Sequence, residues 1–383
     1  MDAGAPPPGA EAPRAPLTRP EAAKPPTAMR SAAPAPGAQA NWDVVPVFYG
    51  TDRQSADMPQ RIAFNSERGK KLVLGRALVT VPKMHQVPMI ERPWVYKLPF
   101  TNIVIIQERE DPEKHFTLRE LKRLSREEFL AVVRARLKAS TRYKNHALIF
   151  VHGFNTTFDF ALYRTAQFAY DLKFDGAPFV YSWPSRGNVS ATSYSYDRES
   201  AQQAEPYLKQ FIELVTARTG ATSVSLVAHS MGNQLLLRVL RDIKRAPPAG
   251  VKISQVILAA PDVDRDAFEN LAQQIKGVSG GITLYAAAND WALTASRKFW
   301  GGVPRAGDVP TGGPVVVNGI DTIDVTATST AIFSLNHSGY AEKSALLNDI
   351  ELLLTTGERP PEKRIPILQR IKTDRGDYWR YPG

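Results

Sequence analysis

Short apolar segments alternate with longer helical segments from residue 146 onward, and this alternation limits the fold more than any other feature of the chain. The segments HALIFV at 146–151 and SVSLVA at 223–228 are apolar almost throughout, which is typical of strands buried on both faces. The segments between them carry apolar residues at helical spacing. Strands and helices in this order predict an α/β fold, with a mostly parallel central sheet and helices on both faces.

The predicted elements cover most of the chain. Strands of the alternating part are predicted at 146–151, 178–183, 223–228, 252–260, 281–288 and 317–326. Helices are predicted at 157–173, 195–218, 264–278, near 291–300 and at 338–356, and another follows 223–228 with Leu236, Val239, Leu240 and Ile243 facing inward. The segments 42–53, 71–82 and 101–110 precede them as strands without intervening helices, which predicts antiparallel opening strands. A charged helix is expected at about 117–140, with Leu130, Val133 and Leu137 on one face.

Composition divides the 383 residues into three parts. Residues 1–40 are mostly Ala, Pro and Gly, and are predicted to be disordered because they bury too little apolar surface to offset the entropy of ordering. Residues 41–357 hold all the predicted elements and are expected to form one domain. Residues 358–383 follow the Gly357 helix stop and are predicted to form a basic C-terminal tail.

Several classes of protein are excluded by composition. The absence of cysteine rules out disulfides, thiolate zinc sites and cysteine nucleophiles. The six histidines show no H-x-x-x-H or H-E-x-x-H spacing, so neither a metal nor another cofactor is predicted. No run of 18 apolar residues occurs, and the N-terminus lacks the apolar core of a signal peptide. We therefore expect a soluble protein, cytoplasmic by default, or periplasmic or exported if a leader has been removed.

The net charge of +10 is concentrated in two regions. Residues 111–144 contain ten Lys and Arg against five Asp and Glu, and residues 358–383 contain seven against four. Such charge either attracts an anionic partner or simply solvates a helix face and a tail. No nucleic-acid motif accompanies it, so nucleic-acid binding is not expected, whereas peripheral contact with an anionic surface stays open.

Ser230 is the predicted nucleophile. The strand 223–228 leads directly into His229, Ser230, Met231 and Gly232, and a helix follows. The pentapeptide A-H-S-M-G has the pattern of a nucleophile elbow, with Ala228 in the first small position instead of glycine. A serine that merely caps the helix is the alternative.

The sequence H-G-F-N, residues 152–155, follows the strand 146–151 and suits an oxyanion loop. Acyl transfer creates an oxyanion that needs two fixed N–H donors. The backbone N–H groups of Phe154 and Met231 are the predicted pair, because Gly153 lets the first backbone approach closely. A glycine turn with a structural histidine is the alternative.

His337 is the predicted base. It follows the last predicted strand, and the chain order serine, acid, histidine is the one that this kind of site uses. Two strands end in candidate acids, Asp290 after 281–288 and Asp262 after 252–260. We predict Asp290 as the acid, because 281–288 is the penultimate strand, and keep Asp262 as the alternative. If Asp290 is the acid, Asp262 or Asp264 is expected to cap a helix or to shape the pocket wall.

These motifs together resemble those of the α/β-hydrolase superfamily and, more narrowly, of a bacterial branch of poorly characterised enzymes described as esterase/lipase-type hydrolases of unknown function. The resemblance covers about 45–345 and rests on V-F-Y-G-T-D-R (47–53), F-V-H-G-F-N (150–155), Y-S-W-P-S (181–185), A-H-S-M-G-N (228–233), A-A-P-D-V-D (259–264) and N-D-W-A-L (289–293). It implies an α/β-hydrolase fold and a Ser-His-Asp hydrolase, carboxylesterase or lipase-like, acting on esters or related acyl bonds. It supplies no substrate.

Further residues are candidates for the pocket: His152, Asn155, Trp183 and His229. Trp183 is expected to line the acyl side of the cleft or to pack in the core, and the sequence does not decide between these. It also leaves open whether Asp52 and Arg53 form a structural ion pair or contact substrate, and whether the long excursion 184–222 is a lid.

The sequence thus predicts a serine hydrolase that takes a small-molecule or lipid-like acyl substrate. The same residues would serve an acyltransferase, a thioesterase or a peptidase, since they fix acyl transfer but not the acceptor. A binding protein on a hydrolase fold is the alternative of another class. The oligomeric state is not indicated.

Overall fold

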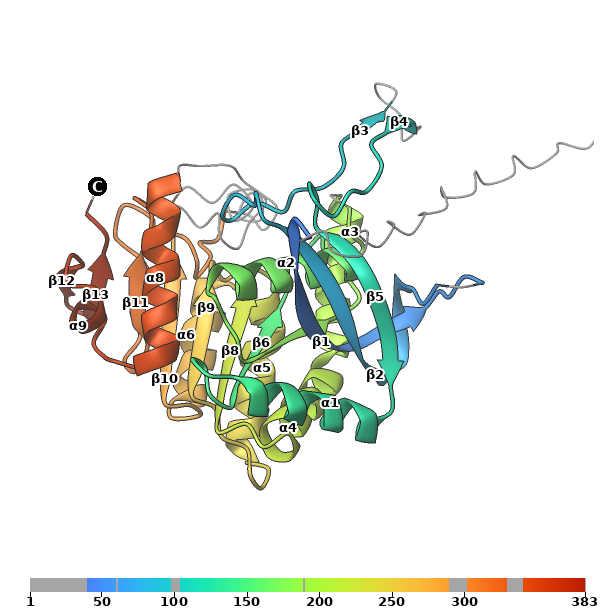
Figure 1. The fold of residues 1–383 in the computed structure, drawn as a ribbon. Coiled ribbons are helices and arrows are strands. Elements are labelled where there is room, and N and C mark those ends of the chain that lie inside the picture. The colour runs from blue at the N-terminus through green and yellow to red at the C-terminus, as the bar shows by residue number, and fades with distance from the viewer. Residues whose placement is uncertain are drawn as a thin grey trace, which may run out of the picture.

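The computed structural model describes residues 40–59, 61–97, 104–188, 190–288, 302–328 and 340–382, and the statements below concern these residues. Its main sheet has eleven strands (Figure 1). They are β1 (Trp42–Ser55), β2 (Phe64–Pro82), β5 (Thr117–Leu124), β6 (His146–Val151), β7 (Ala177–Ser182), β8 (Ser223–His229), β9 (Gln255–Ala259), β10 (Gly281–Ala286), β11 (Asp321–Asp324), β12 (Gln369–Thr373) and β13 (Gly376–Arg380). Their order in the sheet is β12-β13-β11-β10-β9-β8-β6-β7-β1-β2-β5.

The centre of the sheet is parallel and its two edges are antiparallel. The seven central pairs of neighbours are parallel: β1–β7, β7–β6, β6–β8, β8–β9, β9–β10, β10–β11 and β11–β13. The pairs β1–β2 and β2–β5 at one edge, and β12–β13 at the other, are antiparallel. The predicted α/β-hydrolase fold class, with a mostly parallel sheet and antiparallel opening strands, is confirmed.

Helices cover both faces of the sheet. They are α1 (Arg126–Ala139), α2 (Phe158–Asp171), α3 (Ala191–Gln203), α4 (Glu205–Arg218), α5 (Gly232–Arg245), α6 (Arg265–Ile275), α8 (Tyr340–Thr356) and the short α9 (Pro361–Arg364). Side chains of α2 and α8 pack in one buried cluster, and those of α1, α4, α5 and α6 in another. Successive residues of β6 point alternately into the two clusters, Ile149 into one and Phe150 into the other, as expected for a strand buried on both faces.

Two helices pack with the faces that the sequence indicates. The inward residues predicted for α5 are buried, namely Leu236, Val239, Leu240 and Ile243. In α8, Leu346, Ile350 and Leu353 are fully buried. The predicted helical stretch 195–218 consists of α3 and α4, which meet at Ala204, and α4 is a core helix with Leu208 and Phe211 fully buried.

The prediction of a helix at 117–140 is wrong in its first half. Residues 117–124 form β5, which pairs with β2, so a long-range strand pairing outweighs local helix propensity there. The helix α1 begins only after Ser125, whose side chain accepts a hydrogen bond from the N–H of Glu128 while the Glu128 carboxylate accepts one from the N–H of Ser125. Its buried row contains Phe129 in place of the predicted Leu130.

The predicted strand 101–110 is not part of the main sheet. Its described residues form β4 (Val104–Gln107), which pairs with β3 (Val95–Lys97) in a separate two-stranded sheet that projects from the body (Figure 1). The segment 317–326 is not the last strand either, because β12 and β13 follow β11 and extend the sheet.

Residues 358–383, which the sequence sets apart as a basic tail, contain α9, β12 and β13. Their cations hold this part of the fold together. Arg364 forms an ion pair of 2.6 Å with Asp349 of α8, and both side chains are fully buried. Arg380 pairs with Asp324 at 2.9 Å.

Some predictions fall on residues that the structure does not describe. The disordered segment lies there except for Ala40, and so does the short helix near 291–300. Within the described part of the chain, no helix is both long and apolar enough to cross a membrane.

Candidate active site

Ser230 occupies a strained turn between β8 and α5. Its φ of +51° lies in the left-handed region that residues other than glycine rarely adopt. The N–H of Ser230 donates to the carbonyl of Ala259 at 3.0 Å, and its own carbonyl accepts from the N–H of Asp262 at 3.1 Å and from the side-chain amide of Asn233 at 3.0 Å. Strain of this kind persists where the surroundings hold the backbone from several sides, and it concentrates at functional sites.

The elbow is tight, which explains its small residues. A Cβ atom on Gly232 would lie 2.4 Å from the carbonyl oxygen of His152 and 2.7 Å from that of Val151, so only glycine fits. Ala228, on the other side of the serine, is fully buried in the core. The fold therefore accommodates a methyl group where such elbows commonly have glycine.

The loop after β6 packs directly against the serine. A Cβ atom on Gly153 would lie 3.0 Å from the Cβ of Ser230, so the backbone at this position approaches the predicted nucleophile closely. Among the described residues, the N–H groups of Phe154 and Met231 donate to no protein acceptor. The two predicted oxyanion donors thus belong to the two segments that meet at Ser230.

Arg53 is a structural support that the sequence could not assign. Its guanidinium is buried and donates to the carbonyls of Thr156 at 2.7 Å and Ser185 at 3.0 Å, and to the hydroxyl of Ser182 at 2.9 Å. Burial lowers the pKa of Arg53 to about 10. The side chain therefore ties the loop after β6, the predicted oxyanion loop, to the loop after β7. Its neighbour Asp52 instead accepts a hydrogen bond of 2.8 Å from the Tyr181 hydroxyl.

His152, in the loop after β6, forms a stacked pair with Trp183, in the loop after β7. Their rings lie 4.9 Å apart and nearly parallel, at 15°. The indole N–H of Trp183 donates to the His152 carbonyl at 2.8 Å, and Nδ1 of His152 lies 2.9 Å from the Gly153 carbonyl. Trp183 is fully buried, so core packing describes it better than lining of a cleft. Burial, and to a lesser extent Arg53, lowers the pKa of His152 to about 3.

The other two predicted pocket residues are His229, which precedes Ser230 at the end of β8, and Asn155, in the loop after β6. Burial, with a smaller contribution from Arg164, lowers the pKa of His229 to about 3. Asn155 has a φ of +57°, and its N–H lies 3.4 Å from the carboxylate of Asp197 in α3. That carboxylate also accepts hydrogen bonds from the Ser185 hydroxyl at 2.5 Å and from the N–H of Arg186 at 2.8 Å.

Asp262 lies beside the nucleophile, but its carboxylate is already engaged. One oxygen is 2.7 Å from Nε of Arg305 and the other is 2.6 Å from the hydroxyl of Tyr194. Both members of the ion pair are almost completely buried. Asp264 caps α6, as its sequence position suggested, by accepting from the N–H of Ala267 at 3.0 Å. The predicted acid Asp290 and base His337 lie outside the described residues.

Tyr194, Asp197 and Arg305 are site residues that the sequence analysis missed. Tyr194 connects the two sides of the site, because its ring lies 5.3 Å from that of Phe154 while its hydroxyl binds Asp262. Local sequence offers little to identify them. Two belong to a polar helix and Arg305 to a loop, and each gains its role through contacts distant along the chain.

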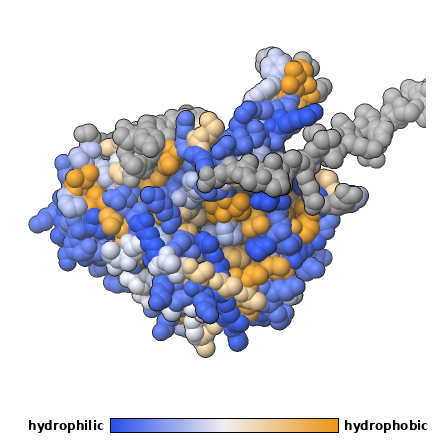
Figure 2. Space-filling model, viewed as in Figure 1, coloured by the Kyte–Doolittle hydropathy of each residue, from blue (hydrophilic) through white to orange (hydrophobic). Residues whose placement is uncertain are grey.

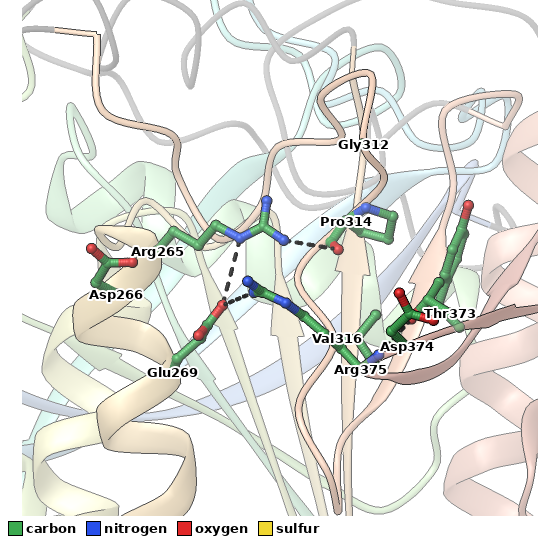
Figure 3. Close-up of a pocket in the computed structure, with 10 residues that line it drawn as sticks. Arg265, Asp266, Glu269, Gly312, Pro314, Val316, Thr373, Asp374 and Arg375 are labelled. Carbon is green, nitrogen blue, oxygen red and sulfur yellow. Dashed lines mark hydrogen bonds and ion pairs between the residues drawn. The ribbon is translucent and has the colours of Figure 1, made fainter.

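A separate cavity of about 560 Å³ lies between α6 and the turn that joins β12 to β13 (Figure 3). Three of its charged side chains contact one another, since Glu269 lies 3.6 Å from Arg265 and 3.3 Å from Arg375, and Arg265 also donates to the carbonyl of Pro314 at 3.2 Å. Ser230, the predicted nucleophile, does not line this cavity, and neither do Phe154 and Met231. It is therefore not the candidate active site.

Comparison with known proteins gives one family. The sequence model of a family described as "Alpha/beta hydrolase of unknown function (DUF900)" matches residues 125–356, more than half of the chain. Among curated proteins, none matches the chain significantly.

Among solved structures, the chain is similar to a protein provisionally described as a cell surface hydrolase, from Lactobacillus plantarum WCFS1. The identity is 14%, and the match covers 59% of this chain and 97% of the other, with a TM-score of 0.33. A similarity this low transfers neither activity nor compartment to this chain.

Proposed function

The chain belongs to this family of α/β hydrolases, and we propose that it is a serine hydrolase that cleaves carboxylic esters, or related acyl bonds, through an acyl-enzyme on Ser230. The observation that carries the proposal is the positive φ of Ser230 at a strand–turn–helix junction, with the Gly153 backbone packed against it. A serine that only capped α5 would have no need of this conformation. Hydrolase membership fits the proposal without specifying the bond that is cleaved.

In the proposed mechanism, His337 takes the hydroxyl proton of Ser230, and the serine oxygen attacks the acyl carbonyl carbon. The N–H groups of Phe154 and Met231 stabilise the resulting oxyanion, and Asp290 orients the imidazole. The histidine then protonates the leaving alkoxide, the bond between the acyl carbon and that oxygen breaks, and the acyl-enzyme remains. Water, deprotonated by the same histidine, releases the acid and restores the serine.

Among the described residues, the two histidines in the segments that meet at Ser230, His152 and His229, are poor candidates for the base. Burial lowers the pKa values of both His152 and His229 to about 3, so neither takes up a proton readily near neutral pH. His152 is also held by its stacking on Trp183 and its contact with the Gly153 carbonyl. This supports the choice of His337, which the chain order predicts.

A fluorophosphonate probe tests the proposal because it forms a covalent bond with an activated serine. We expect labelling of the wild-type protein at the peptide that contains Ser230, and none in Ser230→Ala. Absence of labelling in the folded wild-type protein would favour the rival proposal of a binding protein on a hydrolase fold.

A substrate panel separates the remaining alternatives. Short-chain p-nitrophenyl esters, an acyl thioester and a peptide anilide are compared by kcat/KM, with an added alcohol as a competing acyl acceptor. Ester hydrolysis should dominate. Preference for the thioester or the anilide, or transfer to the alcohol in place of water, would reassign the enzyme to thioesterases, peptidases or acyltransferases.

A further inference from the structure

Two oppositely charged side chains are buried beside the predicted oxyanion loop. Most of the face drawn in Figure 2 is hydrophilic, as expected for a protein whose charged groups remain in water. Asp197, in α3, is instead fully buried, and so, nearly, is Arg53, in β1. Because a carboxylate is costly to bury unless hydrogen bonds replace its water, the partners of Asp197 indicate what this side chain does.

Among the described residues, the hydrogen-bond partners of Asp197 are all donors. One carboxylate oxygen accepts from the N–H of Arg186 at 2.8 Å, and the other accepts from the Ser185 hydroxyl at 2.5 Å. The second oxygen also lies 3.4 Å from the backbone nitrogen of Asn155. An ionised carboxylate matches three donors because it only accepts hydrogen bonds. In an asparagine, an amino group replaces one of the two oxygens, so at least one of these donors would face another donor.

These bonds reach the predicted oxyanion loop by two routes. The direct route is the N–H of Asn155, whose φ of +57° lies in the left-handed region. The indirect route runs through Ser185, because its hydroxyl oxygen accepts from the N–H of Thr156 at 3.0 Å. The direct contact is long, whereas the indirect route is short at both steps. Asp197 thus holds two consecutive N–H groups that follow Phe154.

Arg53 binds the carbonyl groups of the same segments. Its guanidinium donates to the carbonyls of Thr156 and Ser185, while Asp197 accepts from donors of the same two loops. Burial raises the pKa of Asp197, and the hydrogen bonds from its three donors and the charge of Arg53 oppose this effect. The two buried charges therefore complement each other across the loops after β6 and β7.

The peptide group that follows Phe154 is anchored at both ends. Its carbonyl accepts from the Thr156 hydroxyl at 3.2 Å, and its N–H, that of Asn155, points to Asp197. The N–H of Phe154 itself donates to no acceptor among the described residues. An oxyanion donor must be both fixed and unoccupied, because it then needs no reorganisation when the charge develops. The bonds to Asp197 supply the fixed backbone that this requires.

We propose that Asp197 is a positioning residue that holds the N–H of Phe154 in the orientation that stabilises the oxyanion. The inference rests on the proposed hydrolase function, since only acyl transfer gives this loop an oxyanion to bind. It also gives the polar helix α3 a role, as the element that carries this support. A carboxylate with a merely structural role would affect the stability of the fold and not the rate of the reaction.

The test is Asp197→Asn, assayed with a short-chain p-nitrophenyl ester. The fluorophosphonate probe, reacted to completion, counts the active sites, so that kcat is expressed per labelled serine and a loss of folded protein does not lower it. We expect kcat to fall by about 10–100-fold, because a displaced donor stabilises the oxyanion less well. KM should change by less than about threefold, because acylation and deacylation both pass through an oxyanion and are slowed together.

Asp175→Asn is the matched control. Among the described residues, the Asp175 carboxylate also accepts only from donors, the N–H groups of Thr141, Arg142 and Tyr143 and the Thr141 hydroxyl. It holds the segment that precedes β6, at the opposite end of this strand from the predicted oxyanion loop. The control variant should lose stability in urea and keep the kcat and KM of wild type.

Ser185→Ala is a second test, which decides the matter if Asp197→Asn does not fold. It removes the indirect route alone, so kcat should fall by about threefold to tenfold with little change in KM. Wild-type kcat in folded Asp197→Asn would overturn the proposal, as would an equal loss of kcat in Asp175→Asn. If Asp197→Asn does not fold, wild-type kcat in Ser185→Ala would overturn it. A wild-type protein that neither hydrolyses the ester nor reacts with the probe would refute the hydrolase function, and this inference with it.

Discussion

Replacing Asp52 by asparagine should make the protein less sensitive to pH. Asp52 is fully buried in β1, where one carboxylate oxygen accepts from the Tyr181 hydroxyl and the other has no hydrogen-bond partner among the described residues. Burial raises the pKa of this carboxyl group from 3.8 to about 7, despite the opposing effect of the hydrogen bond from Tyr181. The folded protein therefore holds a proton here that the unfolded chain has already lost.

The sign and size of the effect follow from this pKa. Between pH 4 and pH 7 the folded state binds more protons than the unfolded state, so Asp52 makes the free energy of unfolding fall as the pH rises. The difference between the two pKa values corresponds to about 4 kcal/mol of unfolding free energy. The protein loses this contribution as the pH rises through this range, and the loss does not grow further at higher pH. Asparagine does not titrate and still offers an oxygen to Tyr181, so Asp52→Asn should lack this loss.

Urea unfolding at pH 5, 6, 7 and 8 measures the effect. The difference in unfolding free energy between Asp52→Asn and wild type should move in favour of the variant by about 2–3 kcal/mol from pH 5 to pH 8, the part of the total change that falls within this range. Asp374→Asn, at an exposed position, is the control and should follow wild type. A constant difference between Asp52→Asn and wild type at all four pH values would show that Asp52 has the same pKa in the folded and unfolded protein.

Three further predictions concern the site. Asp290→Asn should lower kcat by up to about 10⁴-fold, whereas Asp262→Asn should keep most of its activity. Asp262→Asn should instead lower the free energy of unfolding in urea by roughly 3 kcal/mol, because the buried Arg305 cation loses its partner. The reverse order of activities would make Asp262 the acid. Arg53→Lys keeps the charge but loses the forked guanidinium that donates to two loops, so kcat/KM should fall by about tenfold or more and Tm should be lower. Wild-type kinetics in this variant would show that Arg53 does not support the site. The pH profile of kcat/KM should show one acid limb at about pH 6–7 as His337 is protonated, and EDTA should have no effect; loss on chelation, restored by a metal, would show that the reaction class is wrong.

The parallel core could be predicted because its signal is local. Each strand from β6 to β10 is a compact apolar run, and each is followed by a helical pattern, so the order of elements alone determines the layers. The same order places residues such as Ser230 and Gly153 at strand ends, which is where ligand sites of open parallel sheets lie. The small residues Ala228 and Gly232, two positions before and after Ser230, indicate the tight turn that holds it.

The outermost strands of the sheet, β5 at one edge and β12 and β13 at the other, could not be predicted in this way. The segment 117–124 carries as many charges as a surface helix, and it becomes a strand only because β2 offers it a partner far away in the sequence. The C-terminal residues look like a solvated tail, yet Arg364 is neutralised by Asp349, and β13 pairs with β11. Buried cations such as Arg53 escape notice for the same reason, since their partners come from distant loops.

The role of Ser230 as nucleophile is tested most directly by steady-state hydrolysis of a short-chain p-nitrophenyl ester by wild type and by Ser230→Ala, with urea unfolding to establish that the variant is folded. Because the catalytic groups act as a unit, kcat should fall by at least about 10³-fold in the variant. Hydrolysis by a folded Ser230→Ala protein at the wild-type rate would show that Ser230 is not the nucleophile.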